Sequence, residues 1–218
     1  ETFFNGQKNS NNSKRYHEKQ TGTLCAIHSC NNLLGKQTFN LQDFQTIKTT
    51  LAIPDEQGRC TSVLNCLPKC CCTRCRQDEG NFDANIITMA LAKHSIDLNF
   101  WDTRNKDTEQ LLDLMKDEDC IGLLINQQAG YHNCLKACVI KCLAFCFGNN
   151  GHWVAIKKEK NESNHTTQFI DLNSQFNAPN IYVGDNETKP FLTKHLKSNS
   201  HILIANLLKK KNQRQLMR

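Results

Sequence analysis

The chain has 218 residues, of which 39% are hydrophobic and 22% are charged, and this composition is typical of one folded domain rather than of a disordered chain. The net charge of +6 belongs to one end, because residues 193–218 hold seven Lys and Arg and no Asp or Glu, whereas residues 1–192 sum to −1. We expect residues 208–218 to be a solvated basic tail, and contact with a membrane surface, nucleic acid or an acidic partner is the alternative.

The first part of the chain is predicted to be helical after an Asn-, Ser- and Lys-rich leader, residues 1–15, which we expect to be disordered. Gly35 is a favoured residue just past a helix end, and Asn40 with Asp43 is typical of a capped helix start. Apolar residues at helical spacing indicate a further helix before His94. The predicted helices cover residues 24–34, 40–48 and 85–94, and a Cys-rich loop covers residues 55–80.

The second part is predicted to consist mainly of strands, over residues 98–101, 121–125, 153–156, 168–172 and 202–205. Two helices are expected among them, over residues 107–115 and 188–197, the second beginning at Thr188 with Pro190 in its first turn. Because most of the predicted helices precede most of the predicted strands along the chain, the sequence indicates an α+β protein. If residues 153–156 and 168–172 form an antiparallel hairpin, His152 and Asn173 meet at the same end of it.

A thiol, an imidazole and an amide in the order Cys25, His152 and Asn173 are the parts of a thiol protease. Cys25 begins a predicted helix, where the helix dipole favours a thiolate. His152 would exchange a proton with the thiol, and Asn173 would orient the imidazole. Gln20, five residues before Cys25, could donate an N–H to the oxyanion beside the Cys25 backbone N–H.

Several segments around these residues resemble the Josephin family of ubiquitin-directed cysteine proteases. The resemblance extends from about Tyr16 to Ala205 and is closest to the short stand-alone Josephin proteins. The matching segments are 17–20 (His-Glu-Lys-Gln), 24–28 (Leu-Cys-Ala-Ile-His), 31–34 (Asn-Asn-Leu-Leu), 80–83 (Gly-Asn-Phe-Asp), 101–102 (Trp-Asp), 151–153 (Gly-His-Trp) and 171–174 (Asp-Leu-Asn-Ser).

The resemblance implies a papain-like cysteine protease fold over residues 16–207, with a helical part that carries the nucleophile packed on an antiparallel sheet that carries His and Asn. It implies that Cys25 is the nucleophile, His152 the general base and acid, Asn173 the orienting residue and Gln20 the oxyanion donor. The implied partners are ubiquitin and ubiquitinated proteins, with no nucleic acid, no cofactor and no metal. Trp153 is a candidate wall of the substrate groove, although an aromatic residue on a strand more often belongs to the core. His28 is a structural or substrate-adjacent candidate.

The chain has thirteen cysteines, and most lie in two clusters, six within residues 60–75 and four within residues 134–146. Small secreted scaffolds spread their disulfides over the whole fold, and no signal peptide is visible, so we expect a reducing, intracellular and cytoplasmic location, with a nuclear or membrane-associated one as the alternative. The longest apolar stretch, Tyr131–Phe147, is interrupted by polar residues and is shorter than the roughly 20 apolar residues that a spanning helix needs.

Two other function classes stay open at this point. One is a catalytically impaired protein that binds ubiquitin, in which the loop before His152 keeps the three side chains apart. The other is a Cys-rich metal-binding or redox module, because Cys72 and Cys75 have the spacing of a zinc knuckle. Residues 60–75 and 129–150 also differ in composition from their surroundings and could be translated from non-coding sequence. Reversible lipidation near Lys136 and Lys141 is another option.

Overall fold

The computed structural model describes residues 15–51, 82–102, 104–127, 151–161, 166–198 and 200–208. The predicted leader up to residue 14, the Cys-rich loop, both cysteine clusters and the tail from residue 209 lie outside these described residues. Within the described ranges, no helix is both long enough and apolar enough to cross a bilayer.

A six-stranded sheet is the central element, and every neighbouring pair of its strands is antiparallel. The strand order is β1-β6-β2-β3-β4-β5. The strands are β1 (Ile96–Trp101), β2 (Cys120–Gln127), β3 (His152–Lys160), β4 (Thr167–Asp171), β5 (Asn180–Val183) and β6 (His201–Leu207). The helices are α1 (Cys25–Leu34), α2 (Leu41–Leu51), α3 (Ala84–Ala92), α4 (Thr108–Lys116) and α6 (Gly184–Lys197).

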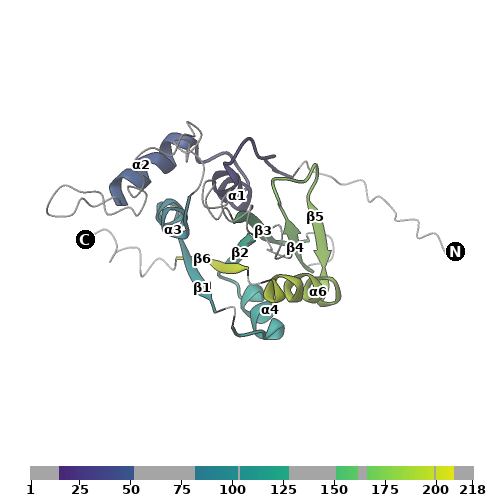
Figure 1. Cartoon of the computed structure of the whole chain (residues 1–218). Coiled ribbons are helices and arrows are strands. Elements are labelled where there is room, and N and C mark those ends of the chain that lie inside the picture. Colours follow the sequence, from purple (N-terminus) through teal and green to yellow (C-terminus); the bar gives the residue numbers. More distant parts are fainter. Residues whose placement is uncertain are drawn as a thin grey trace, which may run out of the picture.

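Helices cover both faces of the sheet, with α1, α2 and α3 on one side and α4 and α6 on the other (Figure 1). Alternate side chains along each strand enter two separate cores, as the pleat of a sheet requires. On β3, for example, Trp153 and Ala155 join the core beneath α1, whereas Val154 and Ile156 join the core beneath α4 and α6. The sheet therefore presents the start of β3 to the helix that begins with Cys25.

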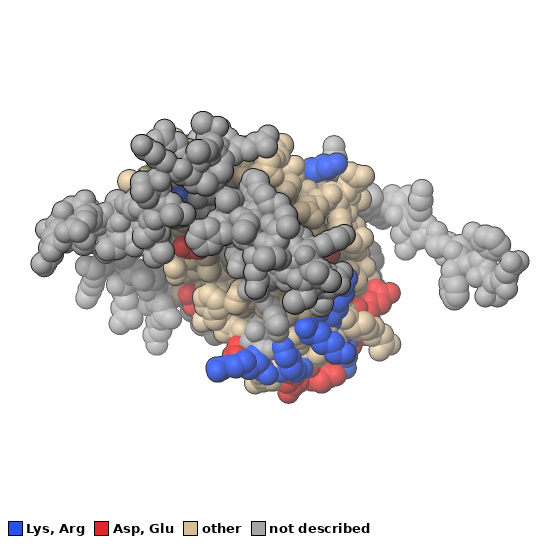
Figure 2. Space-filling model, viewed as in Figure 1, with Lys and Arg blue, Asp and Glu red and all other residues tan. Residues whose placement is uncertain are grey.

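The outer surface of α4 and α6 carries opposite charges side by side (Figure 2). Lys116 on α4 pairs with Asp185 on α6 at 2.9 Å, and Lys189 on α6 pairs with Glu109 on α4 at 2.7 Å. These exposed pairs contribute little individually, about 0–1 kcal/mol. The apolar contacts beneath them hold the two helices to the sheet.

The bounds of the predicted elements lie within four residues of the observed ones, and the α+β class is confirmed. The predicted start of the last helix at Thr188 is wrong, because α6 begins at Gly184 and Pro190 lies inside it. Glu187 accepts the backbone N–H of Val183 at 2.7 Å and, with Asp185, favours a helix start at this earlier point. Strand β5 was not predicted, since its exposed residues lack an apolar alternation.

The predicted hairpin is confirmed and brings the beginning of β3 near the end of β4. Ile156 is paired with Asp171, and Leu172 N–H donates to the carbonyl oxygen of Ala155 at 2.9 Å. The pairing places the residues that follow β4 beside the first residues of β3. His152 and Asn173 therefore meet because of strand register rather than because of any local sequence contact.

Gly122 on β2 should not tolerate a side chain. It has a φ of 152°, and an added Cβ would lie 2.0 Å from the backbone oxygen of Ile156. We expect Gly122→Ala to lower the free energy of unfolding by about 3 kcal/mol or more, from strain and overpacking together. Urea denaturation of the purified protein measures this change.

Gly184→Ala is the matched control, because Gly184 also has a positive φ, 71°, but an added Cβ would meet no atom within 4 Å. Only the backbone conformation is then penalised, by about 1 kcal/mol. Equal losses in the two variants would contradict the close approach of Gly122 to β3.

Candidate active site

Cys25 is the first residue of α1, and it is buried, with 8% of its surface exposed. No side chain among the described residues caps this helix end, so its first backbone N–H groups remain available for negative charge. Burial raises the pKa of the Cys25 thiol, and the backbone N–H groups of Trp153, Ala26 and Cys25 itself oppose that rise. Ser29, one turn further along α1, donates its hydroxyl to the carbonyl oxygen of Trp153 at 2.8 Å. This bond holds α1 against the residue that follows His152.

His152 is the first residue of β3, and its Nε2 lies 2.8 Å from Oδ1 of Asn173. That Oδ1 also accepts the backbone N–H of Gln175 at 3.0 Å, which identifies it as the amide oxygen, an acceptor only. The proton of the neutral ring is consequently on Nε2, and Nδ1 is the basic nitrogen. This geometry is that of an imidazole oriented by an amide so that Nδ1 can take a proton.

Asn173 is buried and is held in place from several directions. Its backbone N–H donates to Asp171 Oδ1 at 3.0 Å, and its backbone oxygen lies 3.1 Å from Nε2 of His17. Burial raises the pKa of Asp171 to about 6, although the Asn173 N–H and the side chain of Asn180 oppose the shift. The orienting amide therefore has a fixed position before any substrate arrives.

Gln20 lies in a segment without helix or strand, residues 16–22, which we name the Gln20 segment. Its backbone N–H donates to the carbonyl oxygen of Ser174 at 2.8 Å, and its Oε1 accepts the Ser174 hydroxyl at 3.1 Å. Its Nε2 donates to the carbonyl oxygen of Gly22 at 3.1 Å, which uses one of two amide hydrogens. The segment is thus attached to the residue that follows Asn173.

Both candidate substrate-binding residues make packing contacts or hydrogen bonds within the fold. Trp153 is 4% exposed and packs in the core beneath α1, where its Nε1 donates to the carbonyl oxygen of Phe82 at 3.1 Å. His28 contacts Glu18 through Nδ1 at 2.7 Å, and its Nε2 accepts the backbone N–H of Thr21 at 3.3 Å. Both ring nitrogens of His28 are thus used inside the fold, and we assign neither residue a contact with substrate.

Several residues that support the candidate site were not predicted from the sequence. Glu18, Asn31, Asn32, Asp171 and Ser174 all belong to segments that carried the family resemblance, which is the one signal that could have pointed to them. Two of them join parts of the chain that lie more than a hundred residues apart, since Asn32 donates to Leu172 and Ser174 donates to Gln20. Local patterns do not encode such pairings.

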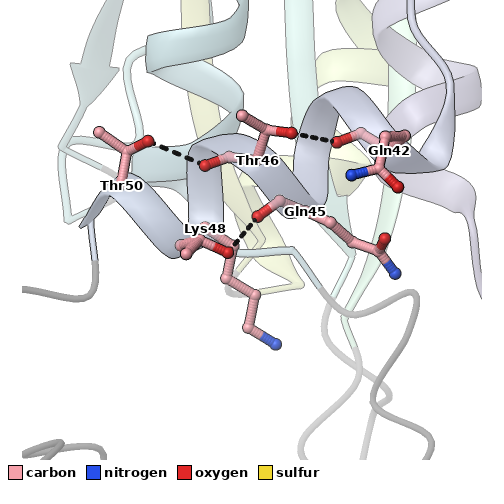
Figure 3. A pocket seen from close by; sticks show the side chains of 6 residues that line it. Gln42, Gln45, Thr46, Lys48 and Thr50 are labelled. Carbon is pink, nitrogen blue, oxygen red and sulfur yellow. Dashed lines mark hydrogen bonds between the residues drawn. The ribbon is translucent and has the colours of Figure 1, made fainter.

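An open polar depression on the outer face of α2 is separate from these residues (Figure 3). It is lined by Gln42, Gln45, Thr46, Lys48, Thr49 and Thr50. The hydroxyls of Thr46, Thr49 and Thr50 donate back to carbonyl oxygens one turn earlier in the same helix, at 2.8–2.9 Å. Among the residues that the structure describes, one helix supplies the whole lining, and these side chains offer no convergent set of groups for a ligand.

Burial determines the resting charge of the proposed catalytic pair. It raises the pKa of the Cys25 thiol above its ordinary value, against the opposing effect of the backbone N–H groups. It lowers the pKa of His152, against the opposing hydrogen bond with Asn173. At neutral pH both groups are therefore uncharged, and a thiolate forms only if His152 accepts the thiol proton.

Comparison with known proteins shows the family to which this chain belongs. The family model for Josephin matches residues 20–206. The chain belongs to the Josephin family. It is similar to human Josephin-2, with 24% identity over 177 residues that cover 81% of this chain and 77% of that protein, and equally to mouse Josephin-2. It is also similar to an Arabidopsis thaliana Josephin-like protein, with 24% identity over 92% of this chain and 50% of that protein.

Membership agrees with the architecture and confirms the resemblance read from the sequence. The helices and the six-stranded antiparallel sheet are those of an α+β, papain-like Josephin fold. Josephin domains form a ubiquitin-related cysteine protease family. The candidate residues Gln20, Cys25, His152 and Asn173 all lie within the matched range.

The neutral resting pair predicts how Cys25 reacts with a small electrophile. We expect the rate of iodoacetamide alkylation at Cys25 to rise with pH through the alkaline range, since thiolate appears only there. At every pH the folded protein should react more slowly than the urea-unfolded chain. Mass spectrometry of the peptide that contains Cys25 separates its rate from those of the other cysteines. A rate plateau that extends into the acid range would reveal a resting thiolate–imidazolium pair and contradict this prediction.

Proposed function

We propose that this protein is a deubiquitinating enzyme that hydrolyses isopeptide or peptide bonds at the C-terminal glycine of ubiquitin through a thioester on Cys25. The observation that carries the proposal is the hydrogen bond between His152 Nε2 and Asn173 Oδ1, which leaves Nδ1 basic at the start of β3, the strand to which Ser29 of the Cys25 helix donates a hydrogen bond. Ubiquitin as the substrate class is supported by the family to which the chain belongs.

The first half of the proposed reaction forms the thioester. His152 Nδ1 takes the proton of Cys25 while the sulfur attacks the glycine carbonyl carbon, and the carbonyl π electrons move onto oxygen. The backbone N–H of Cys25 and the side-chain amide of Gln20 donate to that oxyanion. The C–N bond then breaks, and the leaving lysine amine takes the proton from the imidazolium of His152.

The second half returns the enzyme to its resting state. Water gives a proton to His152 Nδ1 as its oxygen attacks the thioester carbon. Collapse of the tetrahedral intermediate releases the ubiquitin carboxyl group, and the sulfur recovers its proton from His152. Asn173 Oδ1 stays hydrogen-bonded to Nε2–H in both halves, which keeps Nδ1 directed toward the reacting atoms.

A catalytically impaired ubiquitin-binding protein is the second candidate function. The observation that favours it is the burial of Cys25, which is 8% exposed and has a raised pKa. A buried, protonated thiol is a poor nucleophile, and activity then depends on proton transfer to His152. This candidate and the enzyme differ in one measurable respect, since only the enzyme forms a covalent bond with a ubiquitin electrophile.

We expect the wild-type protein to be labelled by ubiquitin that carries a C-terminal electrophile and to cleave a fluorogenic ubiquitin amide. Cys25→Ala should abolish labelling and lower turnover by about 10⁴-fold or more, since it removes the nucleophile. Gel shift and fluorescence report the two activities.

Cys120→Ala is the matched control, because Cys120 is also a buried thiol but lies in the core beneath α4 and α6. It should retain both activities. Tight binding of ubiquitin by a wild type that is neither labelled nor active would reject the enzyme and favour the second candidate.

A further inference from the structure

Glu18 lies two residues before Gln20, and its side chain and its backbone are both bound to α1. Neither a helix nor a strand fixes the Gln20 segment, residues 16–22. Its position therefore depends on side-chain and loop contacts, and Glu18 makes more of them than any other residue of the segment. Any displacement of this segment would move the Gln20 amide relative to the first residue of α1.

The carboxylate of Glu18 accepts hydrogen bonds from three side chains. His28 Nδ1 lies 2.7 Å from Oε2, Asn31 Nδ2 lies 3.1 Å from Oε2 and 3.3 Å from Oε1, and the Tyr16 hydroxyl donates to Oε1. Burial raises the pKa of Glu18, but these hydrogen bonds outweigh burial and hold the pKa below its ordinary value. Glu18 is therefore an ionised acceptor whose oxygens are all used at a site where its side chain is 18% exposed.

The backbone of Glu18 is bound by Asn32, a fully buried residue of α1. Glu18 N–H donates to Asn32 Oδ1 at 2.6 Å, and Asn32 Nδ2 donates to the carbonyl oxygens of Glu18 at 3.2 Å and Leu172 at 3.1 Å. Leu172 directly precedes Asn173. One amide thus joins the three parts of the chain that carry Gln20, Cys25 and Asn173.

The same contacts make His28 a link between the Gln20 segment and α1. Its Nδ1–H donates to Glu18, and its Nε2 accepts the backbone N–H of Thr21. The ring therefore ties the Gln20 segment to α1 at points on both sides of Gln20. With Glu18 anchored on one side and Thr21 on the other, the backbone of Gln20 has little freedom to shift.

We propose that Glu18 is a positioning residue that holds the Gln20 segment on α1 and so keeps the Gln20 amide in place for the proposed oxyanion hole. This role rests on the proposed function, because it acts on the oxyanion formed during attack by Cys25. Glu18 itself touches neither substrate nor reacting atoms. Its effect on catalysis passes through the position of Gln20.

Glu18→Gln keeps the size of the side chain but replaces one acceptor oxygen by a donor, so it cannot satisfy His28, Asn31 and Tyr16 together. We expect kcat for a fluorogenic ubiquitin substrate to fall by about 10- to 100-fold, somewhat less than for the loss of an oxyanion donor. KM should change by less than about twofold, since the lost contact acts in the transition state. Tyr16→Phe removes one donor only and should lower kcat by several-fold.

A double variant separates positioning from a general loss of structure. In the Gln20→Ala background, Glu18→Gln should have almost no further effect on kcat, because the group that Glu18 positions is already absent. The matched control is Asp43→Asn, an equal change at the capped start of α2, where Asp43 accepts the Asn40 N–H at 2.8 Å. The control should leave kcat unchanged in both backgrounds. An equal fall of kcat with and without Gln20 would overturn the proposal.

Hydrogen exchange tests the same role without turnover. The backbone N–H of Gln20 donates to Ser174, and its exchange by NMR should be at least about tenfold faster in Glu18→Gln than in wild type, but unchanged in Asp43→Asn. If the wild type cleaves no ubiquitin substrate, the proposed function fails, and the exchange result still decides whether Glu18 holds the segment. Unchanged exchange in folded Glu18→Gln and Tyr16→Phe would overturn the positioning role.

Discussion

The hydrogen bond between His152 Nε2 and Asn173 Oδ1 joins the first residue of β3 to the loop after β4, and the proposed chemistry depends on it. It exists because antiparallel pairing brings these two points of the chain together. A slip of one residue would turn His152 to the opposite face of the sheet. The two apolar cores prevent that slip, since each alternate residue of β3 is buried on its own side. Packing of the whole domain therefore fixes the orientation of one imidazole ring.

The site combines this rigid pair with a thiol whose resting state is protonated. Burial opposes charge on both Cys25 and His152, so the site holds a neutral pair and creates charge only as bonds change. The uncapped start of α1 then has a clear purpose, because its N–H groups can stabilise charge on sulfur and on the substrate oxygen in succession. In the proposed mechanism, the Gln20 segment adds a further donor, and α1 and the Asn173 loop hold that segment in place.

Sequence reasoning succeeded where the determining signal is local or where the family resemblance is specific. Gly35 ends α1 in a left-handed conformation, as a glycine after a helix predicts, and Asn40 with Asp43 forms the predicted cap of α2. The edge strand β5 was missed because Ile181 and Val183 are exposed and give no alternating pattern. The contacts of Glu18 and Asn32 could not be predicted, since they depend on the packing of three distant segments. Trp153 shows that the role of a single residue cannot be predicted from its neighbour in the sequence. His152 lies at the candidate site, whereas the ring of Trp153 lies in the core.

Nitrogen-15 NMR of the His152 ring shows which ring nitrogen carries a proton, and the proposed mechanism depends most directly on this position. At neutral pH we expect a proton on Nε2 and none on Nδ1, with the signal identified by its loss in His152→Gln. Asn173→Ala should shift the ring toward a mixture of both neutral forms, because the acceptor that selects Nε2–H is removed. A proton on Nδ1, or a doubly protonated ring at neutral pH in the wild-type protein, would contradict a neutral imidazole whose Nδ1 is poised to take the Cys25 proton.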